Sequence, residues 1–147
     1  MNYTEVEIII VEDTPEDAEL MLMSLRKNML ANDLIVLEDG QEALDYVFCE
    51  GKYSSRNKKL LPKVIFLDLK LPKVHGLDVL KKIKSDTRTA KIPVVIVTSS
   101  SEDPDVLKAY EYGANSYVVK PVDFSSFKNT MTELGSYWLV INKEPIP

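Results

Sequence analysis

The sequence predicts an α/β fold in which one sheet of five parallel strands carries helices on both faces. Four short apolar runs and one weaker run recur along the 147 residues, and amphipathic stretches separate them. The runs occupy residues 6–11, 34–37, 64–67, 94–97 and 117–119. The first, third and fourth do not alternate with polar residues, which is typical of parallel strands covered on both faces. Right-handed crossovers then give a doubly wound sheet.

The first two helices are indicated by capping residues and by helical spacing. We expect the first to begin at Pro15, after the cap candidate Thr14 and with Asp17 in the capping-box position. Its apolar face comprises Ala18, Met21, Leu22, Leu25 and Met29. The second is expected from about Gln41 to Cys49. Its inward-facing residues are Ala43, Leu44, Val47 and Phe48.

The remaining helices follow the third, fourth and fifth runs. The third would bury Leu77, Leu80 and Ile83 and leave Lys81, Lys82 and Lys84 as a solvated face. The fourth would open with Asp103 as its cap and Pro104 in its first turn. The fifth carries an apolar stripe that we expect in the core, formed by Phe124, Phe127, Met131, Leu134 and Trp138.

Residues 51–63 interrupt this pattern. The stretch is polar and basic and is long for a helix-to-strand connection, so it predicts a loop, with a functional role as one alternative. Cys49, the single cysteine, allows no disulfide within the chain and reads as a small apolar helix residue.

The length and net charge of the chain limit the functions that it can have. Residues 1–147 suffice for one domain but not for two of ordinary size, so we expect any effector domain on another chain. Eighteen Lys and Arg against 23 Asp and Glu give a net charge of −5, which argues against nucleic-acid binding and favours a protein partner. With no signal-like start and no apolar run near the ~20 residues that span a bilayer, we expect a cytoplasmic protein that contacts no membrane.

Acidic residues stand where two predicted strands end. Glu12 and Asp13 follow the first run, and Asp68 follows the third. If the strand order is 2-1-3-4-5, these strands flank the point where the order reverses, and ligands bind there in such sheets. Crowded carboxylates repel one another unless a hard cation lies among them, and Mg²⁺ prefers oxygen ligands. The sequence therefore predicts a magnesium site.

Hydroxyl groups and a lysine follow the other two strands. Thr98 leads a run of hydroxyl residues through position 101, and Lys120 precedes Pro121, for which a cis peptide bond is an alternative. An acid after a strand is often only a helix cap, a Lys-Pro pair only a turn, and a hydroxyl run only a loop. Together they predict phosphoryl transfer, in which a carboxylate attacks in line.

These motifs resemble those of the response-regulator receiver family over residues 5–138, with 139–147 as a tail. The matching segments are VEDTPED, IFLDLKLPKVHG, VVIVTSS and YVVKPV. The resemblance implies a flavodoxin-like receiver fold in which Asp68 accepts a phosphoryl group from a histidine kinase. It implies that Glu12, Asp13, Asp68 and the backbone carbonyl of Lys70 hold Mg²⁺.

The resemblance also implies a switch. Thr98 and Lys120 would hold the phosphoryl oxygens, and Tyr117 would turn inward behind Thr98, remodelling the surface of the fourth helix, fifth strand and fifth helix. A plain edge-strand aromatic is the alternative for Tyr117. The signal would leave through a downstream protein or onward phosphotransfer, with no DNA-binding output domain and no enzymatic turnover beyond the chain's own phosphorylation and dephosphorylation.

More narrowly, the long loop and the tail resemble single-domain regulators that serve bacterial phytochromes. Their tails imply a homodimer, and residues 137–141 form an apolar segment that a free terminus would not expose. A tail folded back on its own domain is the alternative.

Three positions depart from the family pattern or leave a role open. Glu12 stands where Asp is frequent, and its longer side chain should still reach the metal. His75 stands where an acid is frequent, and we expect it to be solvated. Lys70, close to Asp68, could change the phosphoryl lifetime in either direction.

Two other functions compete with the receiver reading. An aspartyl phosphatase would need its nucleophile after the first strand and a second Asp two residues later, whereas this chain has Glu12-Asp13-Thr14. A receiver-like module that never uses phosphate would usually lack the acidic pair, the aspartate or the lysine. Nucleotide binding is excluded by the lack of a glycine-rich loop after the first strand.

Overall fold

Five parallel strands form one sheet in the order β2-β1-β3-β4-β5 in the computed structural model, which describes residues 6–27 and 33–145. The strands are β1 (Ile8–Val11), β2 (Leu34–Leu37), β3 (Val64–Leu67), β4 (Val94–Thr98) and β5 (Ser116–Val119). This order confirms the predicted one. The chain leaves β1 toward one edge of the sheet and returns through β3 toward the other, so Val11 pairs in register with Leu67 at the point of reversal.

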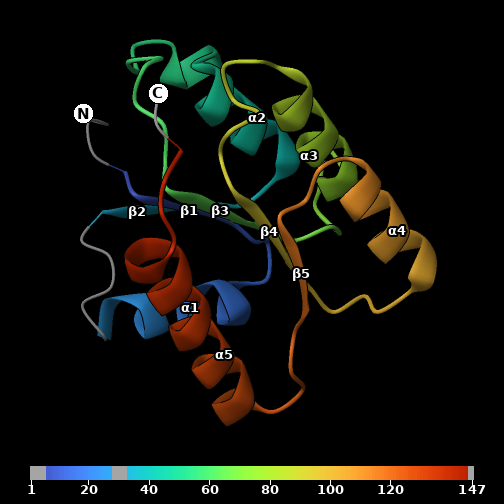
Figure 1. Ribbon diagram of the computed structural model, residues 1–147. Helices are drawn as coiled ribbons and strands as arrows, with labels where there is room; N and C mark the ends of the chain where they lie inside the picture. The colour runs from blue at the N-terminus through green and yellow to red at the C-terminus, as the bar shows by residue number, and fades with distance from the viewer. Residues whose placement is uncertain (1–5, 28–32, 146–147) are drawn as a thin grey trace.

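Within the described residues, five helices cover the sheet on both faces (Figure 1). They are α1 (Pro15–Lys27), α2 (Gly40–Phe48), α3 (Gly76–Ser85), α4 (Asp103–Glu111) and α5 (Phe124–Ser136), with a short 3₁₀ turn η1 (Gly51–Tyr53) and a π-helical turn η2 (Tyr137–Ile141). Helices α1 and α5 pack on one face, and α2 and α3 lie on the other, with α4 beside α3. The predicted α1 residue Met29 lies outside the described residues.

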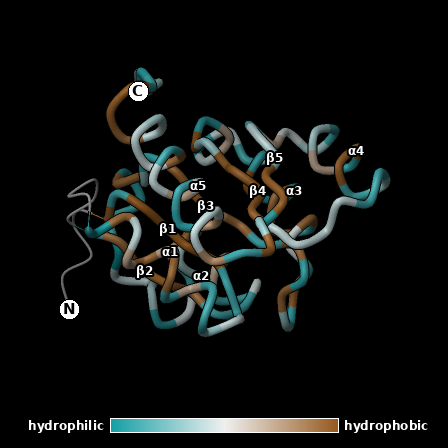
Figure 2. The backbone as a smooth tube through the Cα atoms, turned by 90° about the horizontal axis from the view of Figure 1, so that it is seen from below, coloured by the Kyte–Doolittle hydropathy of each residue, from teal (hydrophilic) through white to brown (hydrophobic). Residues whose placement is uncertain are grey.

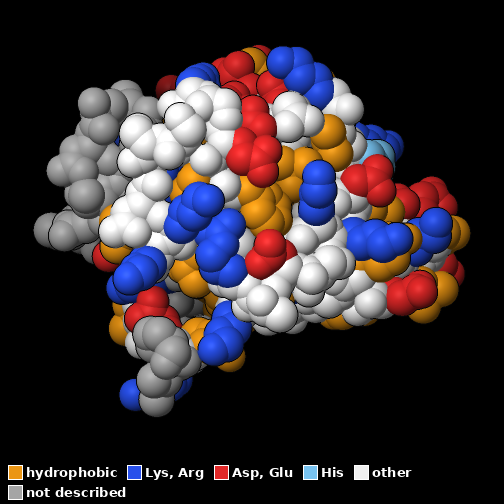
Figure 3. Space-filling model, turned by 90° about the horizontal axis from the view of Figure 1, so that it is seen from above, with side chains coloured by type: hydrophobic (Ala, Val, Ile, Leu, Met, Phe, Trp, Pro, Cys, Tyr) orange, Lys and Arg blue, Asp and Glu red, His pale blue; other side chains and the backbone are white. Residues whose placement is uncertain are grey.

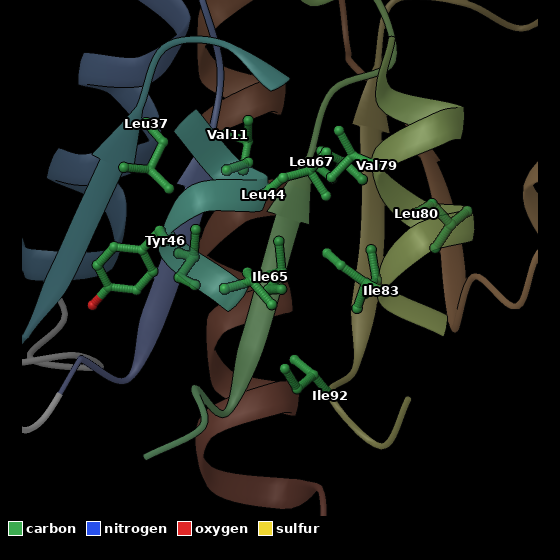
Figure 4. Close-up of a cluster of buried hydrophobic side chains, with 14 of the residues drawn as sticks. Val11, Leu37, Leu44, Tyr46, Ile65, Leu67, Val79, Leu80, Ile83 and Ile92 are labelled. Atoms are coloured by element: carbon green, nitrogen blue, oxygen red, sulfur yellow. The ribbon is translucent and has the colours of Figure 1, made fainter. Parts of the chain in front are cut away.

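In the part of the chain that the structure describes, two apolar clusters, one on each face, explain why the central strands lack alternation. Ile9 and Ile65 point into the cluster under α2 and α3, which Figure 4 shows, whereas Ile8 and Phe66 point toward α1 and α5. Both kinds of position are buried, so every residue of β1 and β3 is apolar. Figure 2 shows the same pattern as hydrophobic colour along the central strands, with hydrophilic stretches around them.

The apolar stripe of α5 enters the core later than predicted. Phe127 and Met131 are buried, and Leu134 and Trp138 pack against the α1 side of the core, but Phe124 is 69% exposed. Placing Phe124 in the core was wrong. It is the first residue of the helix, directly after the cap Asp123, and α5 meets the core only one turn later.

The start of α4 also differs from the prediction. Asp103 is the first helical residue, and the cap position belongs to Glu102, whose side chain makes no capping hydrogen bond. Ser100 serves this end of the helix instead. Its hydroxyl donates to Asp105 Oδ2 at 2.5 Å and accepts from the backbone N–H of Glu102 at 3.3 Å.

Lys84 was predicted to lie on a solvated face with Lys81 and Lys82, and for Lys84 this was wrong. Its ammonium donates to the carbonyls of Ala90 (3.0 Å) and Ile92 (2.6 Å) and to Asn115 Oδ1 (3.0 Å). Burial lowers the pKa of Lys84 to about 8. Lys84 therefore ties α3 to the start of β4 and β5, whereas Lys81 and Lys82 are exposed as predicted.

The 51–63 segment is anchored from inside. Arg56 is 8% exposed and donates to the Tyr46 carbonyl (2.5 Å), to Cys49 Sγ (3.0 Å) and to the Leu60 carbonyl (3.1 Å). Its guanidinium lies 4.0 Å from the centre of the Tyr46 ring. Cys49, predicted as a helix residue, ends α2 in the left-handed conformation with φ 57°. Over this side of the molecule, basic and acidic side chains are interspersed (Figure 3).

The segment after α5 continues the helix instead of leaving it. Tyr137–Ile141 form the π-helical turn, where Trp138 and Leu139 pack on the domain while Val140 and Ile141 remain 69% and 68% exposed. The tail therefore folds back on its own domain through Trp138 and Leu139, while Tyr137, Val140 and Ile141 are exposed; the homodimer stays a prediction.

Among the described residues, no helix is long and apolar enough to cross a membrane.

Candidate functional site

The three carboxylates predicted to bind the metal, Glu12, Asp13 and Asp68, converge where β1 and β3 end. Glu12 and Asp68 are 1% and 7% exposed, and Asp13 is exposed. One carboxylate oxygen from each of the three lies within 4.8 Å of the others. The backbone fixes this arrangement, because Asp68 N donates to the Val11 carbonyl at 3.1 Å and Glu12 N donates to the Leu37 carbonyl at 3.0 Å.

Lys120, which follows β5, reaches into the same cluster. Its Nζ lies 2.5 Å from Glu12 Oε1, 2.8 Å from Asp17 Oδ2 and 3.1 Å from Asp68 Oδ2, and its side chain is 8% exposed. The Lys120–Pro121 peptide bond is not cis, so that sequence-based alternative is wrong. The backbone N–H of Lys120 donates to the Thr98 carbonyl at 2.8 Å, which fixes the lysine to the end of β4.

The pKa values of Glu12 and Lys120 are shifted by their surroundings. Burial raises the pKa of Glu12 to about 7, and the nearby Asp68 adds to this rise, while the hydrogen bond and positive charge of Lys120 oppose it. Burial would lower the pKa of Lys120, but hydrogen bonds with Asp17 and Glu12 outweigh it and raise that pKa. Lys120 therefore stays charged, whereas Glu12 titrates near neutral pH.

The donor set fits a hard divalent cation. All three groups offer carboxylate oxygens, the ligands that Mg²⁺ and Mn²⁺ prefer. One oxygen of each buried carboxylate is held by the backbone: Glu12 Oε2 accepts from Thr14 N at 3.2 Å, and Asp68 Oδ1 accepts from Leu69 N at 2.7 Å. Their other oxygens, Oε1 and Oδ2, contact the Lys120 ammonium.

Asp17 is a site residue that the sequence reading missed. It was interpreted as part of a helix cap, but its carboxylate binds Lys120. The available signal was its position: Asp17 lies in the first turn of α1, the helix that starts at the same rim as Glu12 and Asp13.

Thr98 and Tyr117 lie on the two strands beyond Asp68, Thr98 at the end of β4 and Tyr117 on the edge strand β5. Thr98 is fully buried at the end of β4, and its Oγ1 accepts from Ser100 N at 3.4 Å. Tyr117 is half-buried, and its hydroxyl donates to the Ser100 carbonyl at 2.8 Å. Burial raises the pKa of Tyr117 despite this hydrogen bond, and Asp105 and Asp68 add to the rise. Both predicted switch residues thus contact the β4–α4 loop through Ser100.

The loop after Asp68 is shaped by two residues. Lys73 adopts a left-handed conformation with φ 69°, and His75 caps α3 by accepting from Leu77 N at 3.1 Å through Nδ1. His75 is exposed, as predicted, but its capping role was missed. Lys70 is also exposed, and its carbonyl remains a predicted metal ligand.

Gly76 lets this loop close over Asp68, and we expect Gly76→Ala to destabilise the protein by about 1–3 kcal/mol. A Cβ at position 76 would overlap the backbone carbonyl of Asp68, and rigid backbone cannot move aside cheaply. Urea unfolding of the wild type and the variant tests this. Lys73→Gly is a matched control, because it changes the same loop and relieves a left-handed residue; loss of stability there but not in Gly76→Ala would contradict the prediction.

Residues 8–132 match the family of the response regulator receiver domain. The probable methanogenesis regulatory protein FilR2 of Methanothrix harundinacea is 38% identical over 140 residues, which cover 95% of this chain and 88% of that protein.

Solved structures of response regulators are similar to this chain over most of its length. The Mn²⁺-bound form of response regulator Rcp1 has a TM-score of 0.88 and 32% identity, covering 95% of this chain and 98% of that one. The phosphorylated cyanobacterial phytochrome response regulator RcpA has a TM-score of 0.88 and 30% identity, with coverage of 97% and 100%. The bacteriophytochrome response regulator RtBRR has a TM-score of 0.75 and 48% identity, with coverage of 96% and 85%. A sheet order, an acidic cluster and a family match that agree over most of the chain lead to one conclusion: this chain belongs to the response regulator receiver family of two-component signalling.

Proposed function

We propose that Asp68 accepts a phosphoryl group from a histidine kinase in a Mg²⁺-dependent reaction. The observation that carries this proposal is the position of Asp68, whose carboxylate belongs to an acidic cluster that fits a divalent cation and also contacts the Lys120 ammonium. One carboxylate oxygen attacks phosphorus, a P–O bond forms and the P–N bond of the kinase phosphohistidine breaks. The histidine nitrogen keeps the electron pair of that bond.

The residues at the site have separate proposed roles in metal binding and in phosphoryl binding. Glu12, Asp13, Asp68 and the carbonyl of Lys70 would hold the cation, which when bound would neutralise charge on the phosphoryl oxygens. Lys120 supplies a second positive charge beside Asp68, and its raised pKa keeps it protonated. Thr98, at the end of the adjacent strand, would bind a phosphoryl oxygen through its hydroxyl.

The proposal predicts a single phosphoryl gain on Asp68 after incubation with acetyl phosphate and Mg²⁺, seen by intact mass. Asp68→Ala should abolish the gain, because the attacking carboxylate is absent. Asp78→Ala, which removes an exposed acid from the first turn of α3, is the matched control and should retain it. No gain in the wild type, with acetyl phosphate or with candidate histidine kinases, would favour a module that does not use phosphate.

We further propose that residues 1–147 act as a single receiver domain in the cytoplasm, which signals through protein contacts and not through enzymatic turnover. The switch would run from Thr98 to Tyr117, since both contact the β4–α4 loop through Ser100. A change there would alter the surface of α4, β5 and α5. The likeness to RcpA and RtBRR supports a phytochrome-like kinase as partner, although FilR2 belongs to another regulatory setting.

The same surface would form a homodimer. It exposes large apolar side chains at Leu107, Tyr110, Val119, Val122 and Phe124, and the tail after α5 exposes Val140 and Ile141. We expect the wild type to sediment as a dimer at micromolar concentration and Phe124→Glu to shift it toward monomer, because a charge would be buried at the interface. Met23→Glu, an exposed apolar residue on α1, is the control. Wild-type protein that sediments as a monomer both with and without phosphorylation would contradict the dimer.

A further inference from the structure

Asp17 is the acid around Lys120 that does not belong to the metal-binding cluster. Its Oδ2 lies 2.8 Å from Lys120 Nζ, closer than Asp68 Oδ2 at 3.1 Å. It is carried by the first turn of α1, whereas the other two acids follow strands β1 and β3. Asp17 therefore holds the ammonium from a different side of the cluster.

Lys120 contacts the oxygens of the two buried carboxylates that no backbone N–H binds, and these are the oxygens most open to a divalent cation. The backbone N–H groups of Thr14 and Leu69 already bind one oxygen of Glu12 and one of Asp68. The remaining oxygens of these two buried carboxylates are the ones that lie 2.5 Å and 3.1 Å from Lys120 Nζ. A cation bound there would repel the ammonium and share its ligands, so the ammonium has to give way when the cation enters.

We propose that Asp17 is a positioning residue, which retains the Lys120 ammonium beside the site while a divalent cation takes the oxygens of Glu12 and Asp68. This inference rests on the proposed metal site and assigns a role to a residue outside its ligand set. In the described part of the chain, the ion pairs of Lys120 are with Glu12, Asp17 and Asp68. Once the cation binds the first and the third, Asp17 is the carboxylate that remains.

The placement of Asp17 suits this role. Its side chain is 31% exposed, against 1% for Glu12 and 8% for Asp68, so water can solvate its second oxygen while the first holds Lys120. The Lys120 side chain is 8% exposed and is fixed at its backbone to Thr98. A small shift of Nζ away from Glu12 keeps the ammonium within reach of Asp17 and beside Asp68, where the phosphoryl group would arrive.

The first test is the affinity for Mg²⁺, measured by isothermal titration calorimetry with magnesium chloride on the unphosphorylated protein. Asp17→Asn keeps the shape of the side chain and should weaken Mg²⁺ binding about tenfold, as is typical when a residue that supports metal ligands is lost. Asp17→Glu should recover most of the affinity. Glu16→Gln removes the same charge from the same exposed helical turn and should change the affinity less than about twofold.

The second test separates an action through Lys120 from a direct attraction of Asp17 for the cation. In a Lys120→Met background, Asp17→Asn should change the Mg²⁺ affinity no more than Glu16→Gln does, because there is no ammonium to retain. An equal loss in both backgrounds would show that Asp17 acts directly on the cation and would overturn the proposal. Unchanged affinity of Asp17→Asn in the wild-type background would overturn it too.

A third measurement does not depend on the folding of the Lys120→Met protein. The ¹H–¹⁵N signal of the Lys120 ammonium should persist when Mg²⁺ is added to the wild type, because the group stays held, and should be lost to solvent exchange in Asp17→Asn. Loss of the signal in both proteins would contradict the role of Asp17. Failure of the wild type to bind Mg²⁺ at all would instead refute the proposed metal site.

Discussion

Replacing Lys120 with methionine is expected to lower the free energy of unfolding of the metal-free protein by about 3 kcal/mol at pH 8, because it leaves buried carboxylates without their partner. Glu12 is 1% exposed and lies 2.5 Å from the ammonium, so it cannot recover its hydration when the charge is removed. Methionine keeps most of the side-chain volume, which separates the loss of charge from the creation of a cavity.

The loss of stability in Lys120→Met should be smaller in conditions that reduce the negative charge of the buried carboxylates. At lower pH Glu12 takes up a proton, since burial already raises its pKa to about 7, and the variant should then lose less stability. Mg²⁺ should stabilise Lys120→Met more than the wild type, because the cation no longer competes with an ammonium for Glu12 Oε1 and Asp68 Oδ2. Urea unfolding at pH 6 and pH 8, with and without Mg²⁺, measures the destabilisation by Lys120→Met and its dependence on pH and on Mg²⁺.

Lys63→Met is the matched control for this experiment. Lys63 pairs with Glu7 at 3.6 Å near the surface, with about a third of each side chain exposed, so its loss should change stability by less than about 1 kcal/mol. Equal destabilisation by the two substitutions, or a Lys120→Met protein that is as stable as the wild type, would show that the cluster is hydrated and that its charges are not coupled in the way the distances indicate.

The sheet and most of the site follow from the sequence because both depend on strand ends. Uninterrupted apolar runs mark buried parallel strands, and the residue after each run must lie at one edge of the sheet. Glu12, Asp68 and Lys120 could therefore be placed together without knowing any side-chain contact. Thr98 was placed at the same edge by the same argument, and the family resemblance added Tyr117, whose hydroxyl binds the Ser100 carbonyl in the loop after β4.

The missed features depend on contacts between residues distant in the chain. Asp17 and Lys120 are separated by 103 positions, and Lys84 reaches Asn115 across 31. From the sequence nearby, Asp17 is interpreted only as a helix-capping acid and Lys84 only as a surface lysine. Arg56 is a similar case, because a basic residue in a polar stretch gives no sign that its guanidinium will be buried against Tyr46.

The affinity for Mg²⁺ should fall steeply as the pH decreases below about 7, by about tenfold for each pH unit, because the cation and a proton compete for Glu12. Burial raises the pKa of Glu12 from 4.5 to about 7, with a further contribution from Asp68, so the proton is a competitor at neutral pH and not only in acid. Titration calorimetry between pH 5.5 and pH 8 measures the slope. Glu12→Gln is the control: it should bind Mg²⁺ more weakly but with a much flatter pH dependence.

The free energy of unfolding of the metal-free protein should decrease as the pH rises, because of the same carboxyl group, Glu12. Because the pKa of Glu12 is higher in the folded state, its stabilising contribution is complete below pH 4.5 and is lost as the pH rises through about 7. The difference between 4.5 and about 7 corresponds to on the order of 3 kcal/mol, at about 1.4 kcal/mol for each pKa unit. Saturating Mg²⁺ should oppose this decline, since it binds the ionised form. A metal-free protein whose free energy of unfolding rises between pH 5 and pH 7, and does so equally in Glu12→Gln, would show that Glu12 ionises freely and that other groups control the pH dependence.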